Sequence, residues 1–231
     1  MEVINRPIYL NHIVSLLDRG TMIILIGQRR VGKSFMLKQV QNWIQMNIPA
    51  ANTLYISKEL HAFSHITNAD ELYKYVDTRL STEHKNYLLI DEVQDIAHYE
   101  NALRSLQAED RCQIIATGSN AYVFSSELST RLAGRYIEIP IHSLTYREFL
   151  QFHKREDSDK SLQEYLKVGG LPGLCHYDIS DDVIVFHNGH CRIIKTGTTD
   201  VTFEFFRASA TGQDFHVALL AVILFSFHSL Q

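Results

Sequence analysis

The chain has 231 residues, enough for one sizeable core or for one domain with a small appendage. Its 22 basic and 26 acidic side chains exclude a wholesale basic nucleic-acid binder, although a local basic face remains compatible with them. Three widely spaced cysteines imply no disulfide framework and favour a reducing, cytoplasmic location. The N-terminus lacks a secretion pattern, and the longest apolar run, residues 217–225, is too short for a membrane helix, so we expect no membrane association.

Up to about residue 140, short apolar runs alternate with helical stretches, which is typical of βα units and a parallel sheet. We expect five strands, at residues 22–26, 53–57, 87–90, 112–117 and 136–139. We expect a first helix at residues 8–19, which Gly20 ends. Three more are expected at 33–46, from a capping box at Asn68 to about residue 80, and at 99–107.

After residue 140 we expect no further strands. Thr145 (TYRE) and Ser161 (SLQE) each begin a capping-box pattern, which predicts two helices in a small helical region. The Gly-rich turn GGLPG follows at residues 169–173. From about residue 174 histidine and cysteine become frequent and lysine nearly disappears, and the pattern there predicts no architecture.

Residues 27–34 read GQRRVGKS, a full match to the P-loop pattern, and they lie between an apolar strand and a helix. Gly27 and Gly32 permit a tight turn that aims backbone N–H groups at phosphate oxygens, and the helix dipole adds to the attraction. We expect Lys33 to reach the β- and γ-phosphates of ATP and Ser34 to ligate Mg²⁺. The other candidate nucleotide contacts are Gln28, Arg29, Arg30, Val31 and Phe35. The two arginines contact either phosphates or a partner, or they are solvated.

Residues 87–95 read YLLIDEVQD, an apolar strand that ends in two carboxylates. Asp91 is predicted to hold the Mg²⁺ water shell from the carboxyl edge of the sheet, and Glu92 to act as the general base on the attacking water. The alternative for Asp91 is a helix N-cap, but the P-loop upstream favours the catalytic interpretation. A P-loop kinase, the competing enzyme class, seldom needs an Asp-Glu pair here because its nucleophile is the substrate.

The fourth expected strand ends in the polar sequence TGSN, beside the strand that carries Asp91. Ser119 or Asn120 is the candidate sensor of the γ-phosphate, and the alternative is a simple turn. Arg131 and Arg135 precede the fifth strand, and either is a candidate to act on the γ-phosphate of a neighbouring subunit, which would require self-association. The alternative for these arginines is pairing with surface carboxylates.

The segments GQRRVGKS, LLIDEVQD, IIATGSN, LAGRY, LTYREFL and GGLPG occur in this order. Together they make residues 1–173 similar to bacterial and archaeal AAA+-like ATPases that carry a nuclease-like C-terminal domain. The resemblance implies an α/β P-loop NTPase fold, with a parallel five-stranded sheet in the order 5-1-4-3-2 and a small helical lid. The expected organisation is an ATPase core at 1–142, the start of the lid at 143–173 and an atypical tail at 174–231.

The expected function is Mg²⁺-dependent ATP hydrolysis that drives a conformational switch acting on a protein partner or DNA. The alternative is a nucleotide-dependent binding module with little turnover. The tail departs from the family pattern, and our hypothesis is that it is the frameshifted or truncated end of a longer gene. A further alternative is a zinc-stabilised tail, with a ligand set whose spacing matches no standard finger: Cys175, His176, His187, His190 and Cys191.

Overall fold

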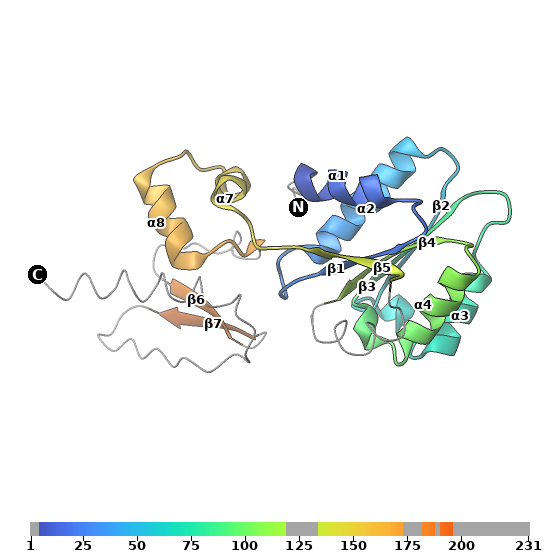
Figure 1. The fold of residues 1–231 in the computed structure, drawn as a ribbon. Helices are drawn as coiled ribbons and strands as arrows, with labels where there is room; N and C mark the ends of the chain where they lie inside the picture. The colour runs from blue at the N-terminus through green and yellow to red at the C-terminus, as the bar shows by residue number, and fades with distance from the viewer. Residues whose placement is uncertain (1–4, 119–133, 173–181, 188–189, 196–231) are drawn as a thin grey trace, which may run out of the picture. The chain divides into compact units, whose positions relative to one another are not determined.

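The computed structural model describes residues 5–118, 134–172, 182–187 and 190–195 (Figure 1). The chain divides into two compact units, Met1–Ser143 and Leu144–Gln231. Three of the predicted site residues, Ser119, Asn120 and Arg131, lie outside the described residues.

The first unit is built on a five-stranded sheet in which every neighbouring pair is parallel. Its strands are β1 (Met22–Ile26), β2 (Asn52–Ser57), β3 (Asn86–Asp91), β4 (Gln113–Gly118) and β5 (Tyr136–Pro140). Their spatial order is β2-β3-β4-β1-β5, which confirms the predicted order 5-1-4-3-2 read from the opposite edge. Strand β1 (MIILI) is a continuous apolar run, as expected where helices cover both faces of the sheet.

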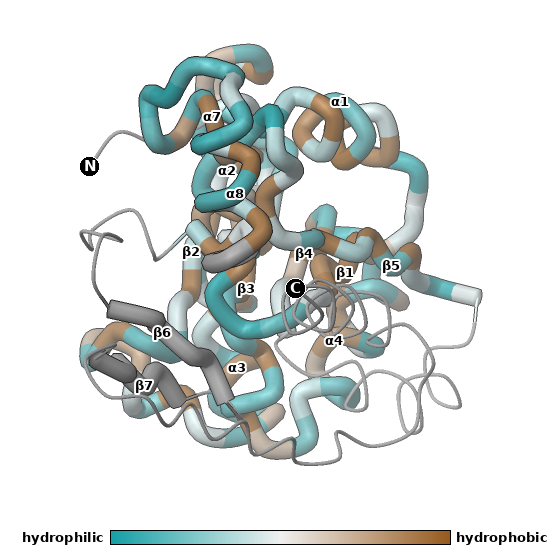
Figure 2. The backbone as a smooth tube through the Cα atoms, turned by 90° about the vertical axis from the view of Figure 1, so that its left-hand side faces the viewer, coloured by the Kyte–Doolittle hydropathy of each residue, from teal (hydrophilic) through white to brown (hydrophobic). Residues whose placement is uncertain are grey.

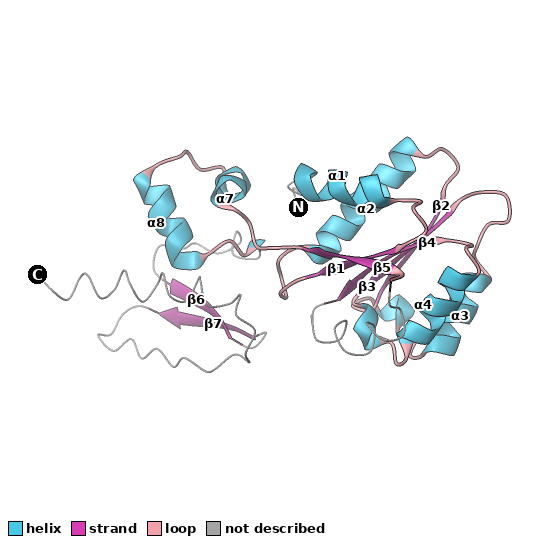
Figure 3. Cartoon of the chain, viewed as in Figure 1, coloured by secondary structure: helices cyan, strands magenta, loops and turns pink. Residues whose placement is uncertain are grey.

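Helices cover the two faces in pairs, with α1 and α2 on one side of the sheet and α3 and α4 on the other (Figures 1 and 3). The helices are α1 (Pro7–Leu16), α2 (Lys33–Asn47), α3 (Ala69–Asp77) and α4 (Tyr99–Ala108), with 3₁₀ turns η1 (His61–Phe63) and η2 (Val93–Asp95). Helix α3 begins where predicted, because the Asn68 side chain accepts a hydrogen bond from the Glu71 N–H.

The hydrophobic core lies along the central strands, which are largely brown in Figure 2. All six residues of β3 are buried, and four of the five residues of β1 are. Side chains of α4 such as Leu103 and Leu106 pack into the same cluster. Burying this apolar surface is the main force that holds the helices on the sheet, and it fixes the carboxyl ends of the strands at one edge.

Helix α1 ends earlier than predicted, at Leu16 and not at residue 19. Asp18 adopts a left-handed φ of 59°, and its carboxylate accepts hydrogen bonds from Lys85 Nζ (2.8 Å) and Tyr87 Oη (3.0 Å). These side-chain contacts pull the chain out of the helix before Gly20 is reached.

The second unit contains the two predicted helices, α7 (Tyr146–His153) and α8 (Asp159–Val168). Thr145 and Glu148 form the predicted capping box of α7. The start predicted for α8 at Ser161 is wrong. Ser158 is the N-cap, because its hydroxyl already accepts the Ser161 N–H (3.2 Å), which places Ser161 inside the first turn.

The prediction that strands stop after residue 140 is also wrong. Strands β6 (Asp182–His187) and β7 (His190–Lys195) form an antiparallel hairpin, with His187 paired to His190. The β-branched residues of both segments favour strands, and the two residues between them are Asn-Gly, the strongest short hairpin signal in a sequence. This local pattern, and not the overall composition of the tail, is the informative signal here.

Candidate functional site

The P-loop connects β1 to α2 at the carboxyl edge of the sheet. Three of its residues have positive φ values: Gly27 (149°), Arg30 (68°) and Gly32 (99°). Gly32 is the N-cap of α2 and provides no side-chain cap. The first N–H groups of α2 therefore face the loop with the positive end of the helix dipole behind them, which is the arrangement that binds phosphate.

The Lys33 side chain folds over this loop. It is 4% exposed, and its Nζ donates hydrogen bonds to the carbonyl oxygens of Gly27 (2.9 Å) and Gln28 (3.0 Å). Burial lowers the pKa of the Lys33 amine, and the carboxylates of Glu92 and Asp91 partly offset this effect. The poorly solvated ammonium of Lys33 thus lies next to the backbone amides of the loop. An anion bound at this place would be stabilised by both.

Asp91 is the buried acceptor at the end of β3, where it is 1% exposed. Its Oδ1 accepts hydrogen bonds from Ser34 Oγ (2.9 Å) and Thr117 Oγ1 (2.7 Å), and its Oδ2 accepts one from Ser57 Oγ (3.4 Å). Hydroxyl and carboxylate oxygens are the ligands that a hard divalent cation prefers. Mg²⁺ commonly takes only one or two ligands from the protein. The donor set of Ser34 and Asp91 therefore fits Mg²⁺.

Glu92 follows immediately and turns sharply away from the strand, with φ 56° and ψ 56°. This left-handed conformation is uncommon for glutamate, and the Glu92 N–H is held by a hydrogen bond to Thr117 Oγ1 (3.0 Å). The carboxylate accepts a hydrogen bond from Gln94 Nε2. Main chain and side chain of Glu92 are thus both fixed beside Asp91 and Lys33.

Several residues of this site were not predicted from the sequence as members of it: Tyr55, Ser57, Glu59 and Gln94. The Tyr55 hydroxyl is buried near Asp91, and its pKa is raised by burial and by the carboxylates of Asp91 and Glu59. Tyr55 and Ser57 stand two residues apart at the carboxyl end of β2, next to β3. Their alternation and strand position are the signal that could have located them.

The remaining P-loop candidates differ in exposure. Gln28, Arg29 and Arg30 are exposed, whereas Val31 is 2% exposed. Phe35 is 41% exposed, and Lys38 Nζ lies 5.6 Å from the centre of its ring. The two arginines are thus exposed members of the phosphate-binding turn.

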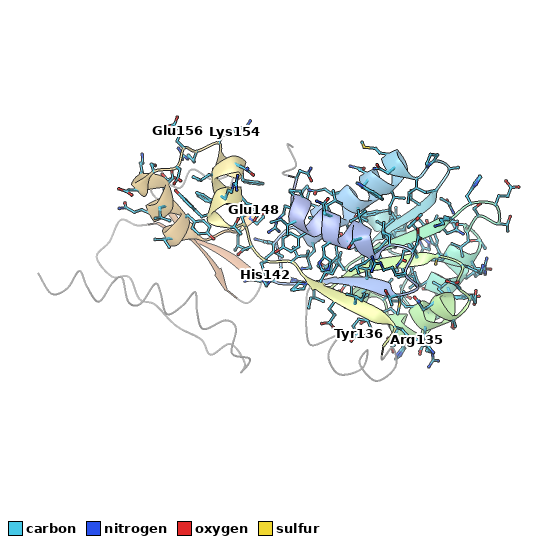
Figure 4. All side chains as sticks on the ribbon, turned by 45° about the horizontal axis from the view of Figure 1, so that its top comes forward. Arg135, Tyr136, His142, Glu148, Lys154 and Glu156 are labelled. Carbon is cyan, nitrogen blue, oxygen red and sulfur yellow. The ribbon has the colours of Figure 1, made fainter. Side chains whose placement is uncertain are left out.

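Arg135 does not join the site of its own chain. It is exposed and precedes β5, and its carbonyl accepts a hydrogen bond from the Met22 N–H (2.9 Å) at the start of β1. Figure 4 labels Arg135 and Tyr136 at one end of β5, and His142 past the other end. Because the five strands of this sheet are all parallel, Arg135, which precedes β5, lies at the amino edge of the sheet, opposite the P-loop.

Among the described residues, no cluster of three or more His, Cys, Asp or Glu side chains is suited to hold a metal ion. Of the proposed zinc ligands, Cys175 and His176 lie outside the described residues. None of the helices in the described part of the chain combines the length and hydropathy that a membrane crossing requires.

The sheet order, the P-loop after β1 and the carboxylate that ends β3 define a P-loop NTPase fold. Residues 19–150, more than half of the chain, match the family described as AAA domain. The chain belongs to this AAA domain family.

Relatives in two organisms are similar over most of this chain. An uncharacterized protein of Haemophilus influenzae is 34% identical over 183 residues, covering 76% of this chain and 46% of that protein. An uncharacterized protein of Methanocaldococcus jannaschii is 30% identical over 201 residues, covering 74% of this chain and 41% of that protein. The chain thus spans less than half the length of these relatives.

Two solved structures have the same fold at low sequence identity. The replication initiator DnaA bound to AMPPCP and single-stranded DNA has a TM-score of 0.53 at 18% identity, covering 77% of this chain and 61% of DnaA. The S. cerevisiae Hsp104:casein complex has a TM-score of 0.51 at 19% identity, covering 75% of this chain and 36% of that one. At these identities the likeness concerns the fold alone, which is that of AAA+ P-loop NTPases.

Proposed function

We propose that this chain binds ATP with Mg²⁺ at the carboxyl edge of its sheet and hydrolyses it. The observation that carries the proposal is the 2.9 Å hydrogen bond between Ser34 Oγ and Asp91 Oδ1, residues that are 57 positions apart. In P-loop NTPases a serine after the lysine and an aspartate at a strand end hold Mg²⁺ together. The structure of DnaA with the ATP analogue AMPPCP bound, which has a similar fold, is consistent with our proposal.

The residues of the P-loop serve in binding. The N–H groups of the loop and of the first turn of α2 donate to the phosphates, and the Lys33 amine leaves the carbonyls of Gly27 and Gln28 to bind the β- and γ-phosphate oxygens. When bound at Ser34 and Asp91, Mg²⁺ supplies neutralisation of the phosphate charge. Gln28, Arg29, Arg30, Val31 and Phe35 complete the proposed nucleotide contacts.

Glu92 serves in catalysis as the general base. Its carboxylate accepts a proton from the attacking water, and its fixed backbone and the Gln94 hydrogen bond keep that carboxylate in one place. Ser119 or Asn120 is the proposed γ-phosphate sensor. Because Arg135 lies at the opposite edge, a role for it is proposed only across a contact between two copies of the chain. Arg131 is the other candidate for such a role.

ATP turnover is proposed to drive a switch that acts on a protein partner or on DNA. The DnaA structure of similar fold is bound to single-stranded DNA, and a partner of this kind is one candidate for the present chain. In this proposal residues 1–142 form the ATPase core and α7 and α8 begin a helical lid, with the tail of the chain outside both. A nuclease-like domain C-terminal to this region belongs to the same proposal for the longer relatives.

The test is steady-state ATP hydrolysis with Mg²⁺, together with ATP binding, in wild type and in Lys33→Ala and Glu92→Gln. Matched controls are Lys74→Ala and Glu83→Gln, which change exposed side chains away from the site. We expect Lys33→Ala to lose binding, Glu92→Gln to bind ATP with kcat lowered by about 10²-fold or more, and both controls to match wild type.

Each other outcome points elsewhere. If wild type binds ATP and does not hydrolyse it, the chain is a nucleotide-dependent binding module. If wild type fails to bind ATP, or if Lys33→Ala binds it equally well, the proposal is wrong.

A further inference from the structure

The buried guanidinium of Arg6 joins two backbone segments that are far apart in the sequence. Arg6 is 6% exposed, and its Nη1 donates to the carbonyl oxygens of His142 (2.9 Å) and Val31 (3.4 Å). Its Nη2 donates to the carbonyl oxygen of Ser143 (3.3 Å). Val31 belongs to the P-loop, and Ser143 is the last residue of the first unit. One side chain therefore ties the P-loop to the exit of the first unit.

The beginning of the P-loop meets the same exit segment directly. The Ile141 N–H donates to the Ile26 carbonyl (2.7 Å), which continues the pairing of β1 with β5. A Cβ atom on Gly27 would lie 2.3 Å from the Ile141 oxygen, so the two main chains are in contact with no side chain between them. The start of the P-loop therefore contacts Ile141 directly, and Val31 within the loop is linked to His142 and Ser143 through Arg6.

Arg6 is itself held from two further sides. Its Cζ lies 4.5 Å from the centre of the Tyr9 ring, and the Tyr9 hydroxyl accepts a hydrogen bond from the His142 N–H (3.3 Å). The Arg6 N–H donates to Gln39 Oε1 on α2 (3.4 Å). A planar guanidinium has five N–H donors in a fixed fork, so it can stack on a ring while it donates to carbonyls of separate segments, and a lysine ammonium does not reproduce this geometry.

Leu144, which follows Ser143 and begins the second unit, is held by hydrogen bonds within that unit. Its N–H donates to the Gly170 carbonyl (2.6 Å), and its carbonyl accepts a hydrogen bond from the Tyr165 hydroxyl (3.0 Å). A Cβ atom on Gly170 would lie 2.1 Å from the Leu144 oxygen. The turn that contains Gly170 thus fixes the main chain at the entry to the second unit.

We propose that Arg6 is a positioning residue that couples the P-loop to the connection between the two units. A shift of the Val31 carbonyl on phosphate binding changes the hydrogen bonds of the guanidinium, and these are shared with His142 and Ser143. Coupling of this kind requires a continuous set of contacts whose equilibrium both ends influence. The trigger, ATP, rests on the proposed function, whereas the tie through Arg6 stands without it.

The first arm of the test uses the full chain without nucleotide and measures backbone hydrogen exchange in wild type, Arg6→Lys and the exposed control Arg104→Lys. We expect Arg6→Lys to speed exchange about tenfold at residues 28–32 and 141–143 together, because losing hydrogen bonds that hold the carbonyls of both segments makes local opening easier. Exchange in β3 and in the control should be unchanged. Acceleration at only one of the two segments would overturn the tie.

The second arm adds Mg²⁺ and AMPPCP. We expect slower exchange at both segments in wild type and at residues 28–32 alone in Arg6→Lys, a difference that a merely structural role would not produce. If nucleotide slows exchange in wild type at residues 28–32 but not at 141–143, the coupling is overturned. This comparison uses wild type alone and so does not depend on the folding of a variant. If neither segment slows in wild type, the proposed nucleotide binding fails, and the first arm still decides the tie through Arg6.

Discussion

Thr117 donates its hydroxyl hydrogen to Asp91 Oδ1 at 2.7 Å and so joins the ends of β4 and β3. The hydroxyl oxygen of Thr117 also accepts the N–H of Glu92 at 3.0 Å. A single fully buried hydroxyl therefore sets the side chain of one acidic residue and the main chain of the next. Both residues of the acidic pair depend on it for their geometry.

Replacing Thr117 by valine keeps the shape of the side chain and removes the hydroxyl. The Glu92 N–H then loses its acceptor, which we expect to lower the free energy of unfolding by about 2 kcal/mol and kcat for ATP by about tenfold or more. Thr117→Ser keeps the hydroxyl and should restore activity to near the wild-type value. Urea unfolding and steady-state hydrolysis measure the two effects. Equal activity in the valine and serine variants would contradict this role of the hydroxyl.

Gln94 restrains the carboxylate of Glu92 through its side-chain amide. In Gln94→Ala the carboxylate gains alternative rotamers, so we expect kcat to fall about tenfold while the affinity for ATP is unchanged. The comparison is Gln45→Ala, which removes an exposed amide on α2. Hydrolysis and equilibrium ATP binding are measured on both. A weaker affinity with normal kcat would show that Gln94 serves in binding and not in orienting the base.

The sheet and the main contact of the site could be predicted because both follow from simple rules. Buried parallel strands are continuous apolar runs, so β1 was located to the residue. The carboxyl ends of parallel strands share one edge, so Ser34 and Asp91 were expected together. The same rule applied to Arg135, which precedes its strand, would have assigned it to the amino edge.

Other parts of the site could not be predicted, because their roles depend on side-chain directions that spacing does not encode. Arg6 lies 25 positions before Val31 and 136 before His142. No pattern in the sequence connects these positions. That Arg6 is buried becomes apparent only from the structure, which shows the carbonyl groups around its guanidinium. Likewise, Gln94 is one of several polar residues near Glu92 in the sequence. Only the fold shows that its side chain contacts the Glu92 carboxylate.

Gly27 and Gly20 offer a matched test of main-chain contact. A Cβ atom at Gly27 would collide with the Ile141 oxygen, whereas nothing lies within 4 Å of one at Gly20, and both residues have positive φ. We expect Gly20→Ala to lower the free energy of unfolding by about 1 kcal/mol, because alanine is strained in the left-handed conformation of this position. Gly27→Ala should cost about 3 kcal/mol or more, because overpacking adds to the backbone strain. Urea unfolding of both variants checks the difference, and equal costs would mean that the P-loop does not rest on Ile141.

Cys112 provides a test of burial just before β4. Cys112 is partly buried against the core, and this burial raises the pKa of its thiol to about 12, so at pH 8 the thiolate fraction should be roughly a hundredfold or more smaller in the native chain than in the unfolded chain. Because this acid has a raised pKa in the folded state, its contribution to stability is complete below pH 9 and is lost as the pH rises toward 12. We expect iodoacetamide at pH 8 to modify Cys112 slowly in the native protein and quickly in urea, with peptide mapping to separate it from the other two cysteines. Equal rates in both conditions would show that the start of β4 opens readily or that the thiol is not protected by burial.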